Sequence, residues 1–225
     1  MYNICYYFLL FIIYAVIGWI CEVILSLFEH KRFINRGFLI GPYCPIYGVG
    51  VLLIISLLKN YTDSWLVLFV LAMVLCMVLE YVTSYLMEKI FNARWWDYSD
   101  NKFNINGRIC LETAIPFGIG GLIIMYIVNP FVVNTIDKFS DNTLLILGIV
   151  SMICFFVDLS ISFGIIYKVR NLNVDIIKDN TEEMTKKVRE YLSNHSVFTK
   201  RLFDSFPNVK VILKDFKKKI YKYSK

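Results

Sequence analysis

Acidic residues recur inside the apolar stretches of this chain, each four residues before a serine. A spacing of four places both side chains on one face of a helix. An ionised carboxylate in hydrocarbon costs about 3 kcal/mol or more, so we expect each acid to face a bundle interior or a wet space. The pattern occurs three times, as Glu22-x-x-x-Ser26, Glu80-x-x-x-Ser84 and Asp158-x-x-x-Ser162.

Two interpretations of these acids stand side by side. Glu88 extends the face of Glu80, and Glu112 begins a later apolar stretch. In the first interpretation the acids pair with loop arginines and clamp the bundle; the candidates are Arg36, Arg94 and Arg108. In the second they line a polar, partly hydrated cavity open to the cytoplasm and handle protons or cations.

We expect membrane helices to carry these acids. The chain is 57% apolar, with runs of about 20 apolar residues that can cross a ~30 Å hydrocarbon layer. We predict an all-α, polytopic membrane protein of the cell membrane with about five spans. They cover residues 4–28, 43–58, 65–87, 109–128 and 144–167. Gly41-Pro42 would break the second span, and residues 38–45 could re-enter the membrane.

Basic residues set the expected orientation. The short loops after the first and third spans hold 7 Lys or Arg, against 2 in the loops on the other side. The positive-inside rule then places the N-terminus outside and the C-terminus in the cytoplasm. We expect a membrane domain over residues 1–168 and a cytoplasmic tail over 169–225.

The tail is basic, with 15 Lys or Arg against 7 Asp or Glu from Lys168 onward. Apolar residues follow helical spacing over 174–193 and, after Pro207, over 209–220. Such amphipathic helices commonly lie on anionic lipid headgroups. The alternative is a helix or coil that packs on the loops. No nucleic-acid motif accompanies the charge, so we expect no nucleic-acid partner.

Two polar loops are the candidate site. In the second loop, Trp95, Trp96 and Tyr98 are typical of the headgroup region. The polar residues beside them are too many for an anchor alone: Arg94, Asp97, Asn104, Asn106 and Arg108. Asn106-Gly107 is a tight-turn signal. The first loop and the following span contribute Asn35, Arg36, Tyr43, Cys44 and Tyr47.

Several chemistries have no signal here. The chain lacks a G-x-x-x-x-G-K-[ST] phosphate loop, a dinucleotide fingerprint, H-E-x-x-H and G-x-S-x-G. Its six cysteines occur singly, and it has two histidines. We therefore assign no metal site, no cofactor and no catalytic residue, and any ATP dependence requires a partner subunit.

The polar motifs resemble the family described as putative ABC-transporter type IV, over about residues 10–165. The matching stretches are Gly18-Trp-Ile-Cys-Glu22, Asn35-Arg-Gly-Phe-Leu39, Gly41-Pro-Tyr-Cys-Pro-Ile-Tyr-Gly48, Glu80-Tyr81, Glu88-Lys89, Arg94-Trp-Trp-Asp-Tyr-Ser99 and Asn104-Ile-Asn-Gly-Arg108. The resemblance implies a permease-like component, with an ATPase in trans and a possible homodimer. Two alternatives stay open: a membrane enzyme acting on lipid or isoprenoid headgroups at the cytoplasmic interface, and a regulatory or scaffold protein.

Overall fold

The chain forms a bundle of long apolar helices joined by two polar loops. The computed structural model describes residues 2–31, 33–35, 37–91, 93–171, 201, 205, 210 and 211. Its helices are α1 (Tyr2–His30), α2 (Pro45–Leu58), the 3₁₀ turn η1 (Lys59–Tyr61), α3 (Trp65–Phe91), α4 (Leu111–Ile123), the π-helical turn η2 (Ile124–Val128), α5 (Asn129–Ile136) and α6 (Asp141–Asn171). Four stretches are long and apolar enough to cross a membrane: Tyr2–Phe28, Trp65–Phe91, Leu111–Ile136 and Asp141–Gly164. The chain is therefore a mostly helical, multi-pass membrane protein.

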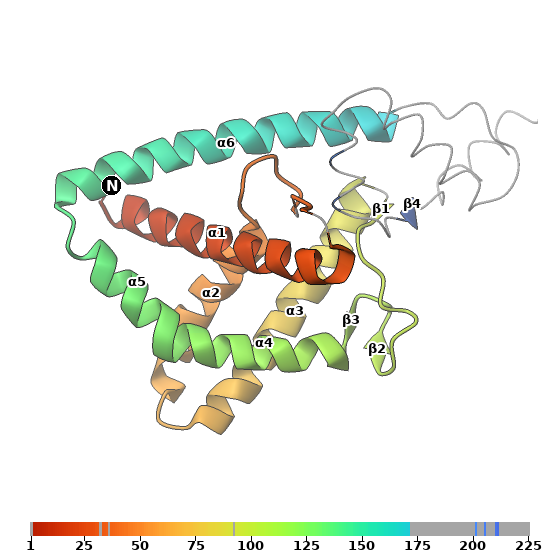
Figure 1. The fold of residues 1–225 in the computed structure, drawn as a ribbon, viewed down its shortest axis with the longest axis horizontal. Coiled ribbons are helices and arrows are strands. Elements are labelled where there is room, and N and C mark those ends of the chain that lie inside the picture. Colours follow the sequence, from red (N-terminus) through yellow and green to blue (C-terminus); the bar gives the residue numbers. More distant parts are fainter. Residues whose placement is uncertain are drawn as a thin grey trace, which may run out of the picture.

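The predicted second span is a short helix that begins inside the bundle. α2 has 14 residues, a length of about 21 Å, which is less than a bilayer core requires. The segment before it, residues 37–44, which we name the insertion loop, runs between α1 and α6 (Figure 1). The Cys44 amide donates to the Ala15 carbonyl at 2.9 Å, halfway along α1. The insertion loop therefore ends halfway along α1, and the short helix α2 begins there.

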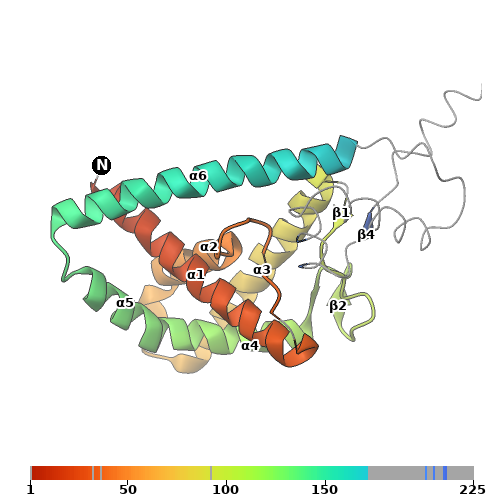
Figure 2. The same ribbon diagram turned by 45° about the horizontal axis from the view of Figure 1, so that its top comes forward.

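Helix packing around α2 builds the core. α1 contacts α2 and α6, while α3 packs along α4 (Figures 1 and 2). A Cβ on Gly121 would lie 2.3 Å from the Ala72 Cβ, so this glycine lets α4 approach α3 closely. One buried cluster joins four helices through Leu10, Tyr14, Val51, Val132, Ile136 and Leu144.

The fourth span extends beyond its predicted end at Val128. The helix widens into the η2 turn and continues as α5 to Ile136. Pro130 lies in the first turn of α5, where its missing N–H and fixed φ are tolerated. The π-helical turn η2 directly before it accommodates the interruption in the backbone hydrogen bonds of the helix. The fifth predicted span is also longer, since α6 covers Asp141–Asn171 and passes the expected domain boundary at residue 168.

Two pairs of short strands lie in the described part of the chain, and the second pair joins the second polar loop to the tail. β2 (Asn104–Ile105) pairs antiparallel with β3 (Ile109–Cys110), and β1 (Ala93–Arg94) pairs with β4 (Lys210–Val211). The helix predicted over 209–220 is therefore wrong at residues 210 and 211, because the free backbone edge of β1 accepts a second strand there. The helix predicted over 174–193 lies outside the described residues.

Both polar loops lie at one end of the bundle. The end of α1, the β2–β3 hairpin and the end of α6 lie at the same end of the bundle, while the N-terminus and the α5–α6 turn lie at the far end (Figure 1). We call the shared end the loop end. We call residues 93–110 the cap loop. This arrangement brings the two predicted site loops together.

Candidate functional site

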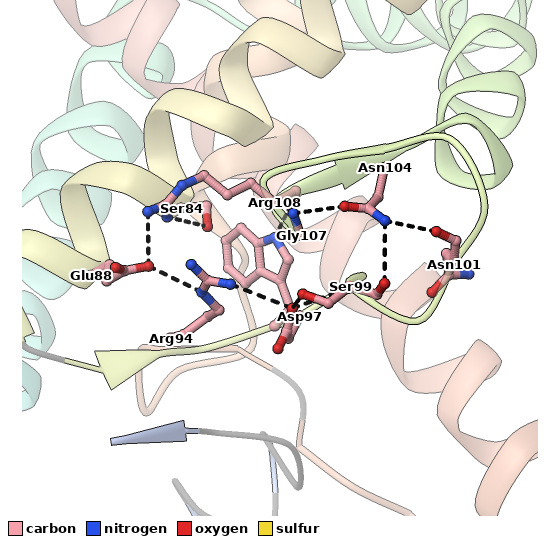
Figure 3. Close-up of polar contacts among 10 residues, drawn as sticks. Ser84, Glu88, Arg94, Asp97, Ser99, Asn101, Asn104, Gly107 and Arg108 are labelled. Carbon is pink, nitrogen blue, oxygen red and sulfur yellow. Dashed lines mark hydrogen bonds and ion pairs between the residues drawn. The ribbon is translucent and has the colours of Figure 1, made fainter. Parts of the chain in front are cut away.

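Glu88, near the end of α3, is the centre of an ion-pair network at the loop end. Its Oε2 atom accepts a hydrogen bond from Arg94 Nε at 3.1 Å and lies 2.8 Å from Arg108 Nη2 (Figure 3). Arg108 Nη1 also donates to Ser84 Oγ at 3.1 Å, and Arg94 Nη1 lies 3.5 Å from Asp97 Oδ1. The predicted arginine pairing is therefore present at Glu88, one turn beyond the Glu80–Ser84 pair.

Two tyrosines that the sequence analysis did not select hold Arg108 in place. The Arg108 guanidinium lies over the rings of Tyr81 and Tyr85, 5.8 Å and 5.6 Å from the ring centroids. Arg108 is only 7% exposed. The available signal was helical spacing, because Tyr81, Tyr85 and Glu88 recur at i, i+4 and i+7 on one face of α3.

The predicted Asn-Gly turn is present and shapes the cap loop. Asn106 and Gly107 both have positive φ, 55° and 66°, as in the mirror-image turns that join two strands. A Cβ on Gly107 would lie 2.4 Å from Ser99 Oγ and 2.5 Å from Asp97 Oδ1. Only glycine lets the turn lie against residues 97–99. The Asn106 side chain donates outward to the Tyr81 hydroxyl at 2.9 Å.

Most polar groups of the cap loop are bonded to one another. Asp97 Oδ1 accepts hydrogen bonds from the Ser99 amide at 3.1 Å and the Ser99 hydroxyl at 2.5 Å. Asn104 donates to the carbonyls of Ser99 and Asn101 and accepts from the Gly107 amide at 3.0 Å (Figure 3). These side chains order the loop, so Asp97 and Asn104 act as its internal framework.

The two tryptophans differ from the expected membrane anchors. Trp95 is 6% exposed and packs against Phe38 of the insertion loop and Phe91 of α3. Trp96 is half-buried and donates from Nε1 to the Arg108 carbonyl at 3.1 Å. The headgroup interpretation is wrong for Trp95, because Phe38 supplies an apolar partner from a loop distant in sequence. The contact also joins the two loops.

Each of the three deep acids accepts a hydrogen bond from a tyrosine hydroxyl. The three pairs are Tyr47–Glu22 at 2.6 Å, Tyr98–Glu80 at 3.1 Å and Tyr43–Asp158 at 2.5 Å. The first interpretation from the sequence expected arginine partners. The contacts found for these acids among the described residues are neutral hydroxyl and amide groups, and Arg36 lies outside the described residues.

Asp158 binds the insertion loop to α6. Its Oδ1 accepts from the Ile40 amide at 3.0 Å and from Ser162 Oγ at 2.9 Å. Its Oδ2 accepts from the Gly41 amide at 2.7 Å and from the Tyr43 hydroxyl. The backbone of an irregular segment inside a membrane must be satisfied by protein groups, and this carboxylate satisfies two such amides. The acid-x-x-x-Ser spacing here is a direct hydrogen bond.

Asn35 orders the start of the first loop and contacts the tail. Its side chain accepts from Trp19 Nε1 at 2.7 Å and donates to the Ile40 carbonyl at 3.2 Å. Its carbonyl accepts from the hydroxyl of Ser205, which is fully buried. Arg201 donates from Nη2 to the Leu39 carbonyl. Sequence reasoning missed Trp19, Arg201 and Ser205, because nothing in their spacing indicated which loop they would meet.

The remaining predicted site residues lie around this core. Glu112 is exposed and accepts from Asn101 Nδ2 at 2.6 Å, so it holds the cap loop to α4 and does not join the deep acids. Cys44 is buried next to α1. A hollow of about 600 Å³ lies on α6 and is lined mostly by apolar side chains, among them Met152 and Phe156. It is not the predicted polar cavity, which stays a prediction.

Tyr98 connects the cap loop with the membrane helices. Its amide donates to the Gly107 carbonyl at 2.8 Å, and its hydroxyl reaches Glu80 on α3. Burial, followed by the nearby Glu80 carboxylate, raises the pKa of the Tyr98 phenol well above its usual range. Tyr98 therefore stays protonated and acts as a hydrogen-bond donor to Glu80.

Comparisons with known proteins identify a family and no individual relative. A search of curated proteins and a search of solved structures each gave no match. The family model described as putative ABC-transporter type IV matches residues 9–163, more than half of the chain. The matched range contains both polar loops and all three deep acids, in agreement with the resemblance found in the sequence. On this match, the chain belongs to the putative ABC-transporter type IV family.

Proposed function

We propose that this chain is the membrane subunit of an ABC-type transport assembly whose ATPase is a separate chain. Family membership and the multi-pass helical structure support this role. The sequence has no nucleotide-binding motif, so ATP hydrolysis requires a partner. The chain is small for a complete transporter, and a homodimer of the membrane subunit would enlarge the pathway.

The observation that carries the proposal is the set of three deep acids held by hydroxyl groups. Glu22, Glu80 and Asp158 lie on α1, α3 and α6, and each accepts a hydrogen bond from a tyrosine. Acids within membrane helices are costly and are typically retained at ion pathways and proton relays. The arginines that could have neutralised Glu80 are instead bound at Glu88. We infer that Glu22 and Glu80 border the transport path.

The same proposal includes an orientation in the cell membrane. The loop end carries the basic residues of both polar loops, so the positive-inside rule favours a cytoplasmic loop end and an external N-terminus. The short α2 and the insertion loop then form a broken helix that opens toward the cytoplasm. Broken helices of this kind commonly line binding sites in transporters.

Purification in mild detergent tests the role directly. A tagged full-length chain should retain an ATP-hydrolysing subunit, and ATP hydrolysis by the complex should fall several-fold in Glu22→Gln and Glu80→Gln. Asp63→Asn, at an exposed residue near the start of α3, should leave hydrolysis unchanged. A stable chain recovered without any ATP-hydrolysing partner would overturn the proposal.

A second role, regulation by the tail, is favoured by one set of contacts. Ser205 and Arg201 bind carbonyls of the first loop, and β4 extends β1 of the cap loop. These contacts support the predicted alternative in which the tail packs on the loops. The remaining basic residues of the tail are proposed to contact anionic lipid headgroups. Removing residues 172–225 should change ATP hydrolysis, and unchanged hydrolysis would reduce the tail to an accessory.

A further inference from the structure

Two buried oxygen atoms in the described part of the bundle have no hydrogen-bond partner. They are Glu80 Oε2 and Ser26 Oγ. Glu80 is 7% exposed and Ser26 is fully buried, so water does not replace the missing partners at the surface. Leaving a buried polar group unsatisfied is costly, and such a group in a native structure indicates a bound species or a functional role.

Glu80 is the deep acid with an open oxygen. Its Oε1 atom accepts the hydrogen bond from the Tyr98 hydroxyl at 3.1 Å, which leaves Oε2 as the open position. Glu22, on α1, accepts from the Tyr47 hydroxyl at 2.6 Å, and Ser26 lies one turn after Glu22 on the same face of that helix.

Among the described residues, no basic side chain forms an ion pair with Glu80. Arg108, whose Nη1 binds Ser84 one turn beyond Glu80, is directed to Glu88. The other titratable side chains on the surrounding elements have partners of their own: Tyr47 on α2 binds Glu22, Glu112 on α4 binds Asn101, and Cys110 of the cap loop contacts Thr113, while Cys76 lies one turn before Glu80 on α3. An ionised carboxylate without a counter-charge is costly in a buried, low-dielectric position, and taking up a proton removes that cost.

We propose that Glu80 binds one proton, carried on its open oxygen Oε2. A protonated carboxyl gains an O–H donor, which Glu80 Oε2 otherwise lacks. Glu80 keeps its bond from Tyr98 on Oε1, so the proton binds without disturbing the cap loop. The assignment rests on the proposed function, since it uses the same acids and makes the transport step proton-dependent.

Infrared difference spectroscopy of the full-length chain in lipid nanodiscs, recorded as the pH is raised, tests the assignment. The wild-type chain should show one buried carboxyl per chain that loses its proton reversibly. Glu80→Gln should remove this signal, and Glu22→Gln should keep it. Asp63→Asn should match the wild type. Thermal unfolding of each variant checks that it is folded.

Each contrary result overturns the assignment. The signal could be absent in the wild type, persist in folded Glu80→Gln, or disappear in folded Glu22→Gln. Displacement of the midpoint by sodium or potassium, compared at equal ionic strength, would assign the site to a metal cation instead. The spectra need no ATP. A missing proton signal in a complex that hydrolyses ATP therefore rejects only the proton site on Glu80, whereas a proton signal without an ATPase partner rejects only the transport role.

Discussion

Asp158 and Glu80 share one local sequence, an acid followed four residues later by serine in a membrane helix, but their surroundings differ. Asp158 accepts four hydrogen bonds, two of them from backbone amides of the insertion loop, and one is from its own Ser162. Glu80 accepts one, and its serine is bound by Arg108 instead. The same motif therefore serves as a clamp on α6 and as an open position on α3.

The two acids accept different numbers of hydrogen bonds because different segments pack against them. An irregular chain segment lies against α6, and its amides require an acceptor that a carboxylate provides. A side chain from the cap loop lies against Glu80, and it offers a single hydroxyl. We expect changes at Asp158 to affect stability first, and changes at Glu80 to affect proton binding and ATP hydrolysis first.

The largest effect is expected for Asp158→Ala. This change leaves the half-buried Ile40 and Gly41 amides without their acceptor, and each buried donor left unsatisfied costs about 1–3 kcal/mol. Thermal or denaturant unfolding in detergent measures the loss. Glu80→Gln should cost less than about 1 kcal/mol, because the glutamine oxygen can still accept from Tyr98.

Asp141→Asn, at the exposed start of α6, is the matched control for Asp158→Ala and should unfold like the wild type. If Asp158→Ala and Glu80→Gln destabilise the chain equally, the distinction between clamp and open position is wrong. If Asp158→Ala is stable but loses ATP hydrolysis, Asp158 belongs to the transport path as well.

Gly107→Ala should have the next largest effect. The new Cβ would meet Ser99 and Asp97, and alanine disfavours the positive φ at this turn, for a combined cost of about 1–3 kcal/mol. The displaced hairpin should move Tyr98 and so alter proton binding at Glu80, while the Asp158 clamp stays intact. Gly120→Ala, where nothing lies within 4 Å, is the control. Equal stability of the two variants would show that the cap loop is not tightly fitted.

Much of the fold follows from the sequence, because apolar length is a strong local signal. Three of the long spans and the Asn106-Gly107 turn were predicted within a few residues of their observed positions, whereas the span that begins at Leu111 continues to Ile136, past its predicted end at Val128. The sequence predicted that residues 38–45 could re-enter the membrane, but not what holds the insertion loop in place, since that depends on the long-range bonds from Ile40 and Gly41 to Asp158. Likewise, Trp95 is buried only because Phe38 meets it, and no local pattern encodes that contact.

The site was predicted as a set of residues and not as pairs. Polar residues in apolar surroundings indicated the acids, Arg94 and Arg108 as candidates, whereas Arg36 lies outside the described residues and Glu112 does not join the deep acids. The partners of the acids were harder to predict, because charge alone favours arginine. In the structure the arginines bind Glu88, and tyrosine hydroxyls donate to the deep acids.

Glu88→Gln should have a moderate effect and separates the arginine network from the deep acids. Glutamine cannot neutralise Arg94 and Arg108, so the loss should be about 1–2 kcal/mol, reduced by the partial exposure of Glu88. Proton binding at Glu80 should strengthen or weaken only slightly, because Arg108 remains held by Ser84 and two tyrosines. Glu112→Gln, at an exposed acid on α4, should change stability less. A large change in the infrared signal of Glu88→Gln would mean that the two groups of acids act as one.

The smallest effect is expected for Ser205→Ala, which tests whether the tail supports the clamp side. The change removes the bond to the Asn35 carbonyl and should cost about 1 kcal/mol or less. Global unfolding should barely change, so the useful measurement is maleimide labelling of Cys44, resolved by mass spectrometry. Cys44 ends the insertion loop and is 7% exposed. Faster labelling of Cys44 with unchanged proton binding at Glu80 would mean that the tail stabilises only the region around Asp158. A shift in proton binding would mean that the tail also acts on Glu80, through β4 and the cap loop.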